Sequence, residues 1–166
     1  QWFLLGQIEK ALGHNDKAYK AFRNVLRQHP PYELQFNARI AITEVVEKGK
    51  SKKMIAKLRR MATNDNNAQY LDQVYYALGN IHLANGDTLK AIDAYEKGNK
   101  KSQRSGVEKG VLLLRLGNIY WQKERFADAH RCYSEALGLI DKDRDDYKEL
   151  SQRSVILDQL VPHTNA

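Results

Sequence analysis

The sequence predicts an all-α protein: a right-handed α-solenoid of about four helix pairs followed by a C-terminal capping helix. One spacing occurs three times, in which a glycine is followed twelve residues later by an alanine and four residues after that by an aromatic residue. The chain has 166 residues, of which 42% are hydrophobic and only 3 are prolines, so it can bury one sizeable core. We expect residues 1–166 to form a single array. Because the sequence begins at Gln1, directly before an apolar helix, we also expect it to be part of a longer protein.

Each copy of the spacing is expected to form a pair of antiparallel helices. Gly6, Gly79 and Gly117 should leave room for an alanine of the partner helix, while large residues fill the space on either side. Gly13 and Gly86 stand between paired helices, where glycine can adopt the left-handed backbone that ends a helix and a nearby Asp or Thr can cap the next. A plain helical bundle with chance periodicity is the alternative, and three copies of one spacing count against it. The alanines and aromatic residues are Ala18 and Phe22, Ala91 and Tyr95, and Ala129 and Tyr133.

One divergent pair is expected between Gly6 and Gly79, whose separation of 73 residues is about two repeat periods plus a few residues. It would occupy about residues 31–65, after Pro30-Pro31 ends the preceding helix. Its first helix is expected at about 32–48 and its second at about 51–62. The apolar stripes are Leu34, Ala38, Ala41 and Val45 in the first helix and Met54, Ile55, Leu58 and Met61 in the second, with a turn at 49–51 and a loop at 64–67.

The chain then continues with two further pairs and the capping helix. The four repeats are expected at about 1–30, 31–65, 68–102 and 105–140, with about four extra residues near 100–105. The Asp-rich segment 141–146 should begin the capping helix, expected at 144–161, because negative charge favours the N-terminal end of a helix. Its apolar stripe, which should cover the exposed face of the last repeat, is Tyr147, Leu150, Leu157 and Leu160.

These positions resemble the tetratricopeptide repeat. Trp2-x2-Leu5-Gly6 and Leu116-Gly117-x2-Tyr120 carry the resemblance, whereas Glu9 and His82 stand where the family has an aromatic residue. The resemblance covers nearly the whole chain. It implies a superhelix whose first helices line a concave groove, and a non-enzymatic role in binding a protein or peptide partner there.

The family's groove-lining positions lie three before, one after and four after the motif glycine, and Arg115 should border the groove as well. Asn80 and Asn118 could donate to and accept from a peptide backbone. The alternative is that Trp121 and Leu83 merely pack against neighbouring repeats or the C-terminal helix. The residues carried over are Phe3, Gln7, Lys10, Tyr76, Asn80, Leu83, Leu114, Asn118 and Trp121.

One subclass of the family grips the carboxyl terminus of chaperone tails with Lys, Asn and Arg at fixed groove positions. Phe3, Gln7, Ala77 and Val111 fill four of those positions here, and only Arg115 agrees. A chaperone-tail clamp is therefore not expected.

A basic run at residues 48–60 contains seven Lys and Arg residues and no acidic residue, in a chain of net charge +7. A solvated helix face is one interpretation, and an acidic protein or anionic surface is another. The alternative function is therefore a basic helical-repeat module that binds an acidic polymer or nucleic acid, although charge alone gives only salt-sensitive, nonspecific binding. The run consists of Lys48, Lys50, Lys52, Lys53, Lys57, Arg59 and Arg60.

No motif indicates catalysis, a metal or a cofactor. The sequence has no Gly-rich phosphate loop, no His-Glu-x-x-His and no nucleophile elbow. The five histidines are scattered, and Cys132, the single cysteine, is expected to be an inert, partly buried thiol. We expect neither an enzyme nor a small-molecule substrate. No apolar run is long enough for a membrane helix, so any membrane contact would use an anchor upstream of this sequence.

A narrower resemblance is carried by Pro31-Tyr32-Glu33 with residues 36–40 (FNARI), by residues 72–80 (DQVYYALGN) and by residues 153–162 (RSVILDQLVP). These stretches resemble the tetratricopeptide lipoproteins of Bacteroidota that are associated with gliding motility and type IX secretion. The resemblance implies a place on the periplasmic side of the outer membrane and a scaffold role for other envelope proteins.

Overall fold

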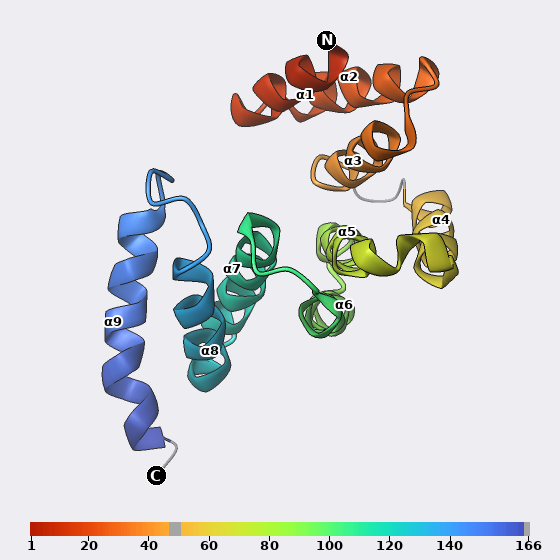
Figure 1. Cartoon of the computed structure of the whole chain (residues 1–166). Helices are drawn as coiled ribbons and strands as arrows, with labels where there is room; N and C mark the ends of the chain where they lie inside the picture. The colour runs from red at the N-terminus through yellow and green to blue at the C-terminus, as the bar shows by residue number, and fades with distance from the viewer. Residues whose placement is uncertain (47–50, 165–166) are drawn as a thin grey trace.

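Figure 1 shows the computed structural model of the chain, which describes residues 1–46 and 51–164. Within these ranges the regular structure consists of nine α-helices and one 3-10 helix, and no strand occurs, so the all-α fold is confirmed. The elements are α1 (Trp2–Ala11), α2 (Asn15–Arg27), α3 (Tyr32–Thr43), α4 (Lys52–Thr63), η1 (Asp65–Tyr70), α5 (Leu71–Ala84), α6 (Thr88–Lys101), α7 (Val107–Gln122), α8 (Phe126–Leu137) and α9 (Tyr147–Thr164).

The helices stack in chain order as a solenoid. Within a unit, α1 packs against α2, α5 against α6, and α7 against α8. Between units, α2 packs against α3, α4 against α5, α6 against α7, and α8 against α9. The result is a curved array with α3, α5 and α7 on its inner side and α4, α6 and α8 on its outer side (Figure 1).

At each motif glycine the nearest atoms to the free space belong to the aromatic ring that lies sixteen residues later. Ala18, Ala91 and Ala129, which were expected to face these glycines, are fully buried. A bulky ring lies flat against the backbone only where no side chain projects, which explains why glycine is needed there. An added Cβ would lie 2.5 Å from Phe22 at Gly6, 2.4 Å from Tyr95 at Gly79 and 2.9 Å from Tyr133 at Gly117.

The turns within the three motif pairs share one backbone conformation. Gly13 and Gly86 both have φ of +81°, which confirms the left-handed glycines expected there. Glu124, at φ of +59°, takes the corresponding place between α7 and α8. The expected side-chain cap is not formed at Asp87, whose carboxylate instead lies 3.7 Å from the Lys90 ammonium.

The divergent unit differs from the expectation. Helix α3 ends at Thr43 rather than near residue 48, because i→i+3 bonds tighten its end and β-branched residues follow. Helix α3 lies between α2 and α5 and buries residues toward both of these helices, Ala41 and Phe36 among them. Leu34 lies on neither of these two sides and is therefore 36% exposed. Among the described residues, α3 and α4 do not pack closely against each other as the other pairs do.

The segment after α4 is the 3-10 helix η1 rather than a loop. Asn67 is buried there, accepts a hydrogen bond from the Tyr32 hydroxyl, and donates through Nδ2 to the Met61 carbonyl at 3.0 Å. This asparagine therefore ties α3, α4 and η1 together. Of the turn expected at 49–51, residues 49 and 50 lie outside the described residues.

Helix α9 begins at Tyr147, after the Asp-rich segment instead of within it. Inside that segment the Arg144 guanidinium pairs with Asp146 at 2.9 Å, so the acidic residues form a local turn structure. Leu150 and Leu157 are buried as expected, but Leu160 is 42% exposed and Val161 is buried in its place. A spacing of four residues keeps Val161 on the side of Leu157 that faces α8.

Candidate functional site

Three of the predicted groove residues meet at one carboxylate, Glu44, directly after α3. The Lys10 ammonium lies 3.1 Å from Glu44, and the Tyr76 hydroxyl donates to Glu44 at 2.7 Å. Arg115 lies 3.9 Å from Glu44, with its guanidinium 5.4 Å from the centre of the Tyr76 ring. Because these residues come from α1, α5 and α7, a single carboxylate connects all four units on the inner side of the curve.

The electrostatics of this cluster favour its neutral tyrosines and its charged arginine. Burial raises the pKa of the Tyr76 hydroxyl far above its usual range, and the hydrogen bond to Glu44 acts in the same direction. Burial opposes the charge of Arg115, but Tyr76, Tyr95 and Glu44 outweigh it and raise the pKa of this guanidinium. The cluster therefore holds a fixed positive charge at the inner side of α7.

Asn80 lies inside the array instead of facing a groove. Asn80 is only 4% exposed. Its Oδ1 accepts hydrogen bonds from the Tyr95 hydroxyl at 2.7 Å and from Arg115 Nη1 at 2.8 Å. Its Nδ2 donates to the Thr43 hydroxyl at 3.3 Å. The amide oxygen is thus fully used within the protein, and its structural task is to hold Arg115 in place.

The next unit repeats this arrangement with Asn118. Its Oδ1 accepts from the Tyr133 hydroxyl at 2.5 Å and from Arg153 Nη1 at 3.4 Å. Arg153 stands 38 residues after Arg115, the same step as from Gly79 to Gly117. Helix α9 therefore presents its arginine to the preceding unit as α7 does.

The remaining groove candidates divide between surface and core. Gln7 is exposed, Leu83 is 36% exposed, and Phe3 is half-buried with its ring 5.5 Å from that of Phe22. Leu114, by contrast, is 3% exposed and belongs to the core, so it presents no surface to a partner.

Trp121 is half-buried between α7, α8 and α9. Its ring lies 5.9 Å from Phe126 and 6.5 Å from Tyr133, and the Arg153 guanidinium lies 4.9 Å from its centre. It thus packs against the C-terminal helix, as the alternative interpretation held. The same tryptophan also lines a small pocket of about 210 Å³ between α7 and α9, together with Asn118 and Glu149.

The basic run does not form one patch. Lys52, Lys53, Lys57, Arg59 and Arg60 are all exposed on α4, whereas Lys48 and Lys50 lie outside the described residues. Lys53 and Lys57 line a pocket toward α2 and α3, while Arg59 lines another toward α5 and α6. The run is thus divided between two sides of its helix.

The described residues contain no group of three or more His, Cys, Asp or Glu side chains that could hold a metal ion. Burial raises the pKa of the Cys132 thiol to about 12, so this cysteine stays protonated and unreactive at neutral pH. Burial lowers the pKa of His82, a nearly buried residue on α5. Over the same part of the chain, no helix combines the length and the apolar character that crossing a membrane requires.

Glu44 is the inner-side residue that the sequence analysis missed. The groove-lining positions are counted from the motif glycine. Because the divergent unit has no motif glycine, this counting could not identify Glu44. A signal does exist: it is an acidic residue between the buried Ala41 and Val45, where an unpaired carboxylate would be costly.

Comparison with known families agrees with the repeat pattern. Two family models, both described as tetratricopeptide repeat, match the chain, one at residues 72–100 and 111–143 and the other at residues 2–31. Together they cover more than half of the sequence. A comparison with curated proteins gives no match.

Proposed function

The chain belongs to the tetratricopeptide repeat family, and from that premise we propose that it is a non-enzymatic scaffold that binds a protein or peptide partner along its inner face. By inner face we mean the side formed by α1, α3, α5 and α7. Repeats of this family generally mediate protein–protein interactions, and neither matching model indicates catalysis.

The observation that carries the proposal is the cluster around Glu44. It fixes the relative positions of four consecutive units, so that the inner face is a preorganised surface and loses little freedom on binding. Lys10 and Arg115 in this cluster keep 37% and 32% of their side-chain surface exposed, and Leu83 supplies an exposed apolar contact on α5. These residues, with Gln7, are the contacts that we propose for a partner.

A matched pair of exposed leucines tests the proposal. Leu83 lies on α5 at the inner face, and Leu89, which is 74% exposed, lies on α6. In the protein expressed in its native cells, a photo-crosslinking amino acid replaces each leucine in turn. We expect Leu83 to crosslink to a defined partner and Leu89 not to. The purified partner should then bind the Leu83→Glu variant at least tenfold more weakly than the parent, and Leu89→Glu nearly unchanged, because losses of this size arise only at central contacts.

Crosslinks from Leu89 alone, or equal loss of affinity in both variants, would show that the partner uses another surface. Circular dichroism of both variants serves as the folding control, and the helical content of each should match that of the parent.

We further propose that the protein acts in a cell-envelope assembly of the secretion or motility kind, on the periplasmic side of the outer membrane. The support is the resemblance of residues 31–40, 72–80 and 153–162 to lipoproteins of that kind. Fractionation of native cells tests this location: the protein should be found in outer-membrane fractions and be protected from external protease in intact cells. Recovery in the cytosolic fraction would exclude this location.

A further inference from the structure

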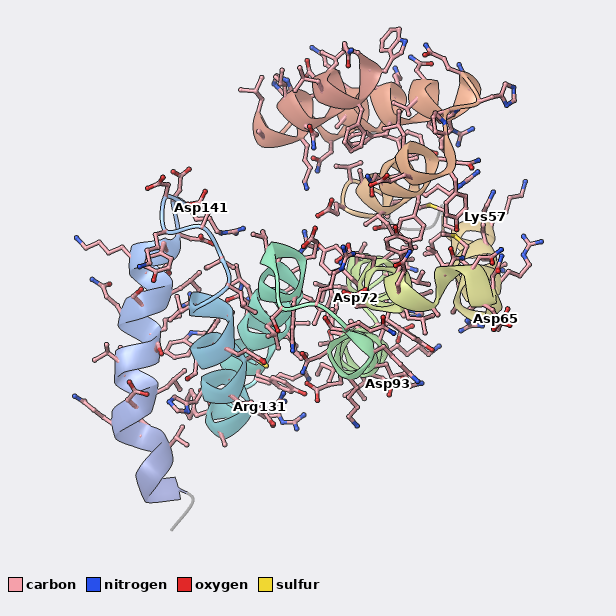
Figure 2. The ribbon with its side chains drawn as sticks, viewed as in Figure 1. Lys57, Asp65, Asp72, Asp93, Arg131 and Asp141 are labelled. Atoms are coloured by element: carbon pink, nitrogen blue, oxygen red, sulfur yellow. The ribbon has the colours of Figure 1, made fainter. Side chains whose placement is uncertain are left out.

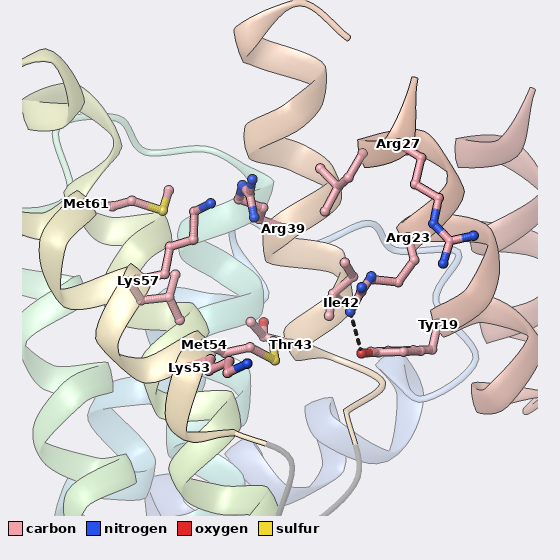
Figure 3. A pocket seen from close by; sticks show the side chains of 12 residues that line it. Tyr19, Arg23, Arg27, Arg39, Ile42, Thr43, Lys53, Met54, Lys57 and Met61 are labelled. Atoms are coloured by element: carbon pink, nitrogen blue, oxygen red, sulfur yellow. Dashed lines mark hydrogen bonds between the residues drawn. The ribbon is translucent and has the colours of Figure 1, made fainter. Parts of the chain in front are cut away.

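A pocket of about 420 Å³ lies between α2, α3 and α4, at the place where the divergent unit departs from the others. Because α3 and α4 do not pack closely against each other, the side chains between them leave an open space (Figure 3). Its volume is within the range of small-ligand and side-chain binding pockets.

The pocket is lined by five cations and, within the described part of the chain, by no acidic residue. None of the five forms an ion pair with a described carboxylate; the hydrogen bonds made by two of them go to neutral groups, from Arg23 to the Tyr19 hydroxyl at 3.0 Å and from Arg27 to Asn24 at 3.4 Å. Figure 3 shows Lys57 and Arg39 reaching toward each other across the opening. The five cations are Arg23, Arg27, Arg39, Lys53 and Lys57.

These cations repel one another. Burial and Arg23 lower the pKa of Arg39, and burial, Arg39 and Arg60 lower the pKa of Lys57. An anion placed among them would remove this repulsion and gain hydrogen bonds to charged donors, which are stronger than neutral ones.

The positive charge of the chain is concentrated in the part of the sequence that supplies the residues lining this pocket. Residues 17–63 contain twelve Lys and Arg residues against three acidic residues, a formal charge of +9, whereas the remainder of the chain sums to −2. In Figure 2, Lys57 on α4 and Asp141 ahead of α9 lie on opposite sides of the array. The segment that contains α2, α3 and α4 therefore carries most of the chain's excess positive charge.

Beneath the cations the pocket is apolar. Ile42 and Leu58 are 5% and 3% exposed, and Leu26, Met54 and Met61 are half-buried beside them. Methionine side chains adapt to ligands of different shape. A ligand that matches this lining presents an apolar group in the centre and negative charges around it.

We propose that this pocket binds an acidic peptide segment of a partner protein, with an apolar side chain inserted between α3 and α4 and flanking carboxylates paired with the five cations. A nucleic acid matches less well, because its phosphates need an extended track and its bases need aromatic stacking, and Tyr19 is the one aromatic side chain among the described lining residues. A second copy of the chain also matches poorly, since its most acidic run, residues 141–149, has a formal charge of only −2.

The pocket differs from the inner-face site in its chemistry and in most of its lining residues, although α3 borders both. Lys53 and Lys57 extend from α4, on the outer side of the curve, and Arg23 and Arg27 extend from α2. A partner could therefore engage both sites at once, and each can be disabled without changing the residues of the other.

The test uses a fluorescein-labelled peptide of sequence Asp-Glu-Phe-Leu-Glu-Asp, titrated with the purified 166-residue chain and followed by fluorescence anisotropy. Two further peptides serve as comparisons: Asn-Gln-Phe-Leu-Gln-Asn lacks the charges, and Asp-Glu-Ala-Ala-Glu-Asp lacks the apolar side chains. We expect saturable binding of the first and at least tenfold weaker binding of each of the others, because the pocket needs both features.

Two protein variants locate the binding. Lys53→Gln/Lys57→Gln removes two lining charges, and Lys52→Gln/Arg60→Gln removes two charges of the same helix that do not line this pocket. We expect at least a tenfold loss in the first and less than a threefold loss in the second. Equal losses in the two would reduce the effect to general surface charge and overturn the proposal.

Competitors identify the ligand class. Inorganic phosphate, a single-stranded oligonucleotide and vesicles containing phosphatidylglycerol are each added to the labelled complex. We expect none to displace the peptide at a matched concentration of negative charge. No saturable peptide binding, or stronger binding of the oligonucleotide or vesicles, would overturn the proposal. The Leu83→Glu variant, which changes the inner face, should bind the peptide normally. The proposal for this pocket and the proposal for the inner face can therefore fail independently of each other.

Discussion

At the scale of single residues, two hydrogen-bonded triads join consecutive units. Each consists of an asparagine after the motif glycine, a tyrosine fifteen residues later and an arginine thirty-five residues later. Asn80, which also donates to the Thr43 hydroxyl, is buried among these partners, and this revises the expectation that it faces a partner protein. The first unit lacks the triad because Gln7 and Phe22 stand where Asn and Tyr would be.

Asn80→Ala should lower the free energy of unfolding by ~2–3 kcal/mol, because Asn80 is buried and its loss leaves the buried Tyr95 hydroxyl and Nη1 of Arg115 without their acceptor, while Arg115 keeps only the longer contact of 3.9 Å to Glu44. Asn118→Ala should cost only ~1 kcal/mol, since Asn118 is half-buried and Arg153 keeps a second partner in Glu149 at 3.1 Å. Urea unfolding followed by circular dichroism measures both. Equal losses in the two variants would contradict the structural role assigned to Asn80.

At the scale of elements, the motif pairs could be predicted because their spacing records a direct contact between a glycine and a ring. The divergent unit could not, because it lacks the motif and α3 is buried on two sides. A single apolar stripe therefore described Leu34 wrongly and left Phe36 out. The interior position of Asn80 could not be predicted either, since its partners lie 15 and 35 residues away.

The turn before α8 offers a prediction at the same scale. Glu124 is exposed and occupies the left-handed region, where a residue with a side chain is strained and glycine is not. Glu124→Gly should therefore raise the free energy of unfolding by ~0.5–1 kcal/mol, despite the greater backbone freedom of glycine in the unfolded chain. Gly86→Ala at φ of +81° should lower it by ~1 kcal/mol. Thermal unfolding of the two variants decides the point, and destabilisation by Glu124→Gly would refute it.

At the scale of the whole molecule, the core holds several groups that must stay protonated. Burial is the largest cause in each case, and it raises the pKa of Cys132 from 9.0 and that of Tyr120 from 10.0 to about 12. The pKa values of Tyr76, Tyr95 and Tyr133 are raised as well. These side chains come from units three and four, so alkaline pH acts on the same half of the array that carries both triads.

The protein should lose stability steeply as the pH rises above about 9, where the unfolded chain begins to release protons that the folded protein keeps. Each such group contributes up to ~1.4 kcal/mol per pH unit, and its loss ends near its folded pKa of about 12 for Cys132. Lys57, whose pKa is lowered, acts in the opposite direction, but its exposed side chain contributes little. Urea unfolding between about pH 7 and about pH 11 measures the slope.

Cys132→Ala should lower stability at neutral pH, because it leaves a small cavity, and yet make the alkaline slope shallower, because one of the buried protonated groups is gone. An alkaline slope that this substitution leaves unchanged would contradict the burial of these protonated groups. So would a free energy of unfolding that does not change above pH 9.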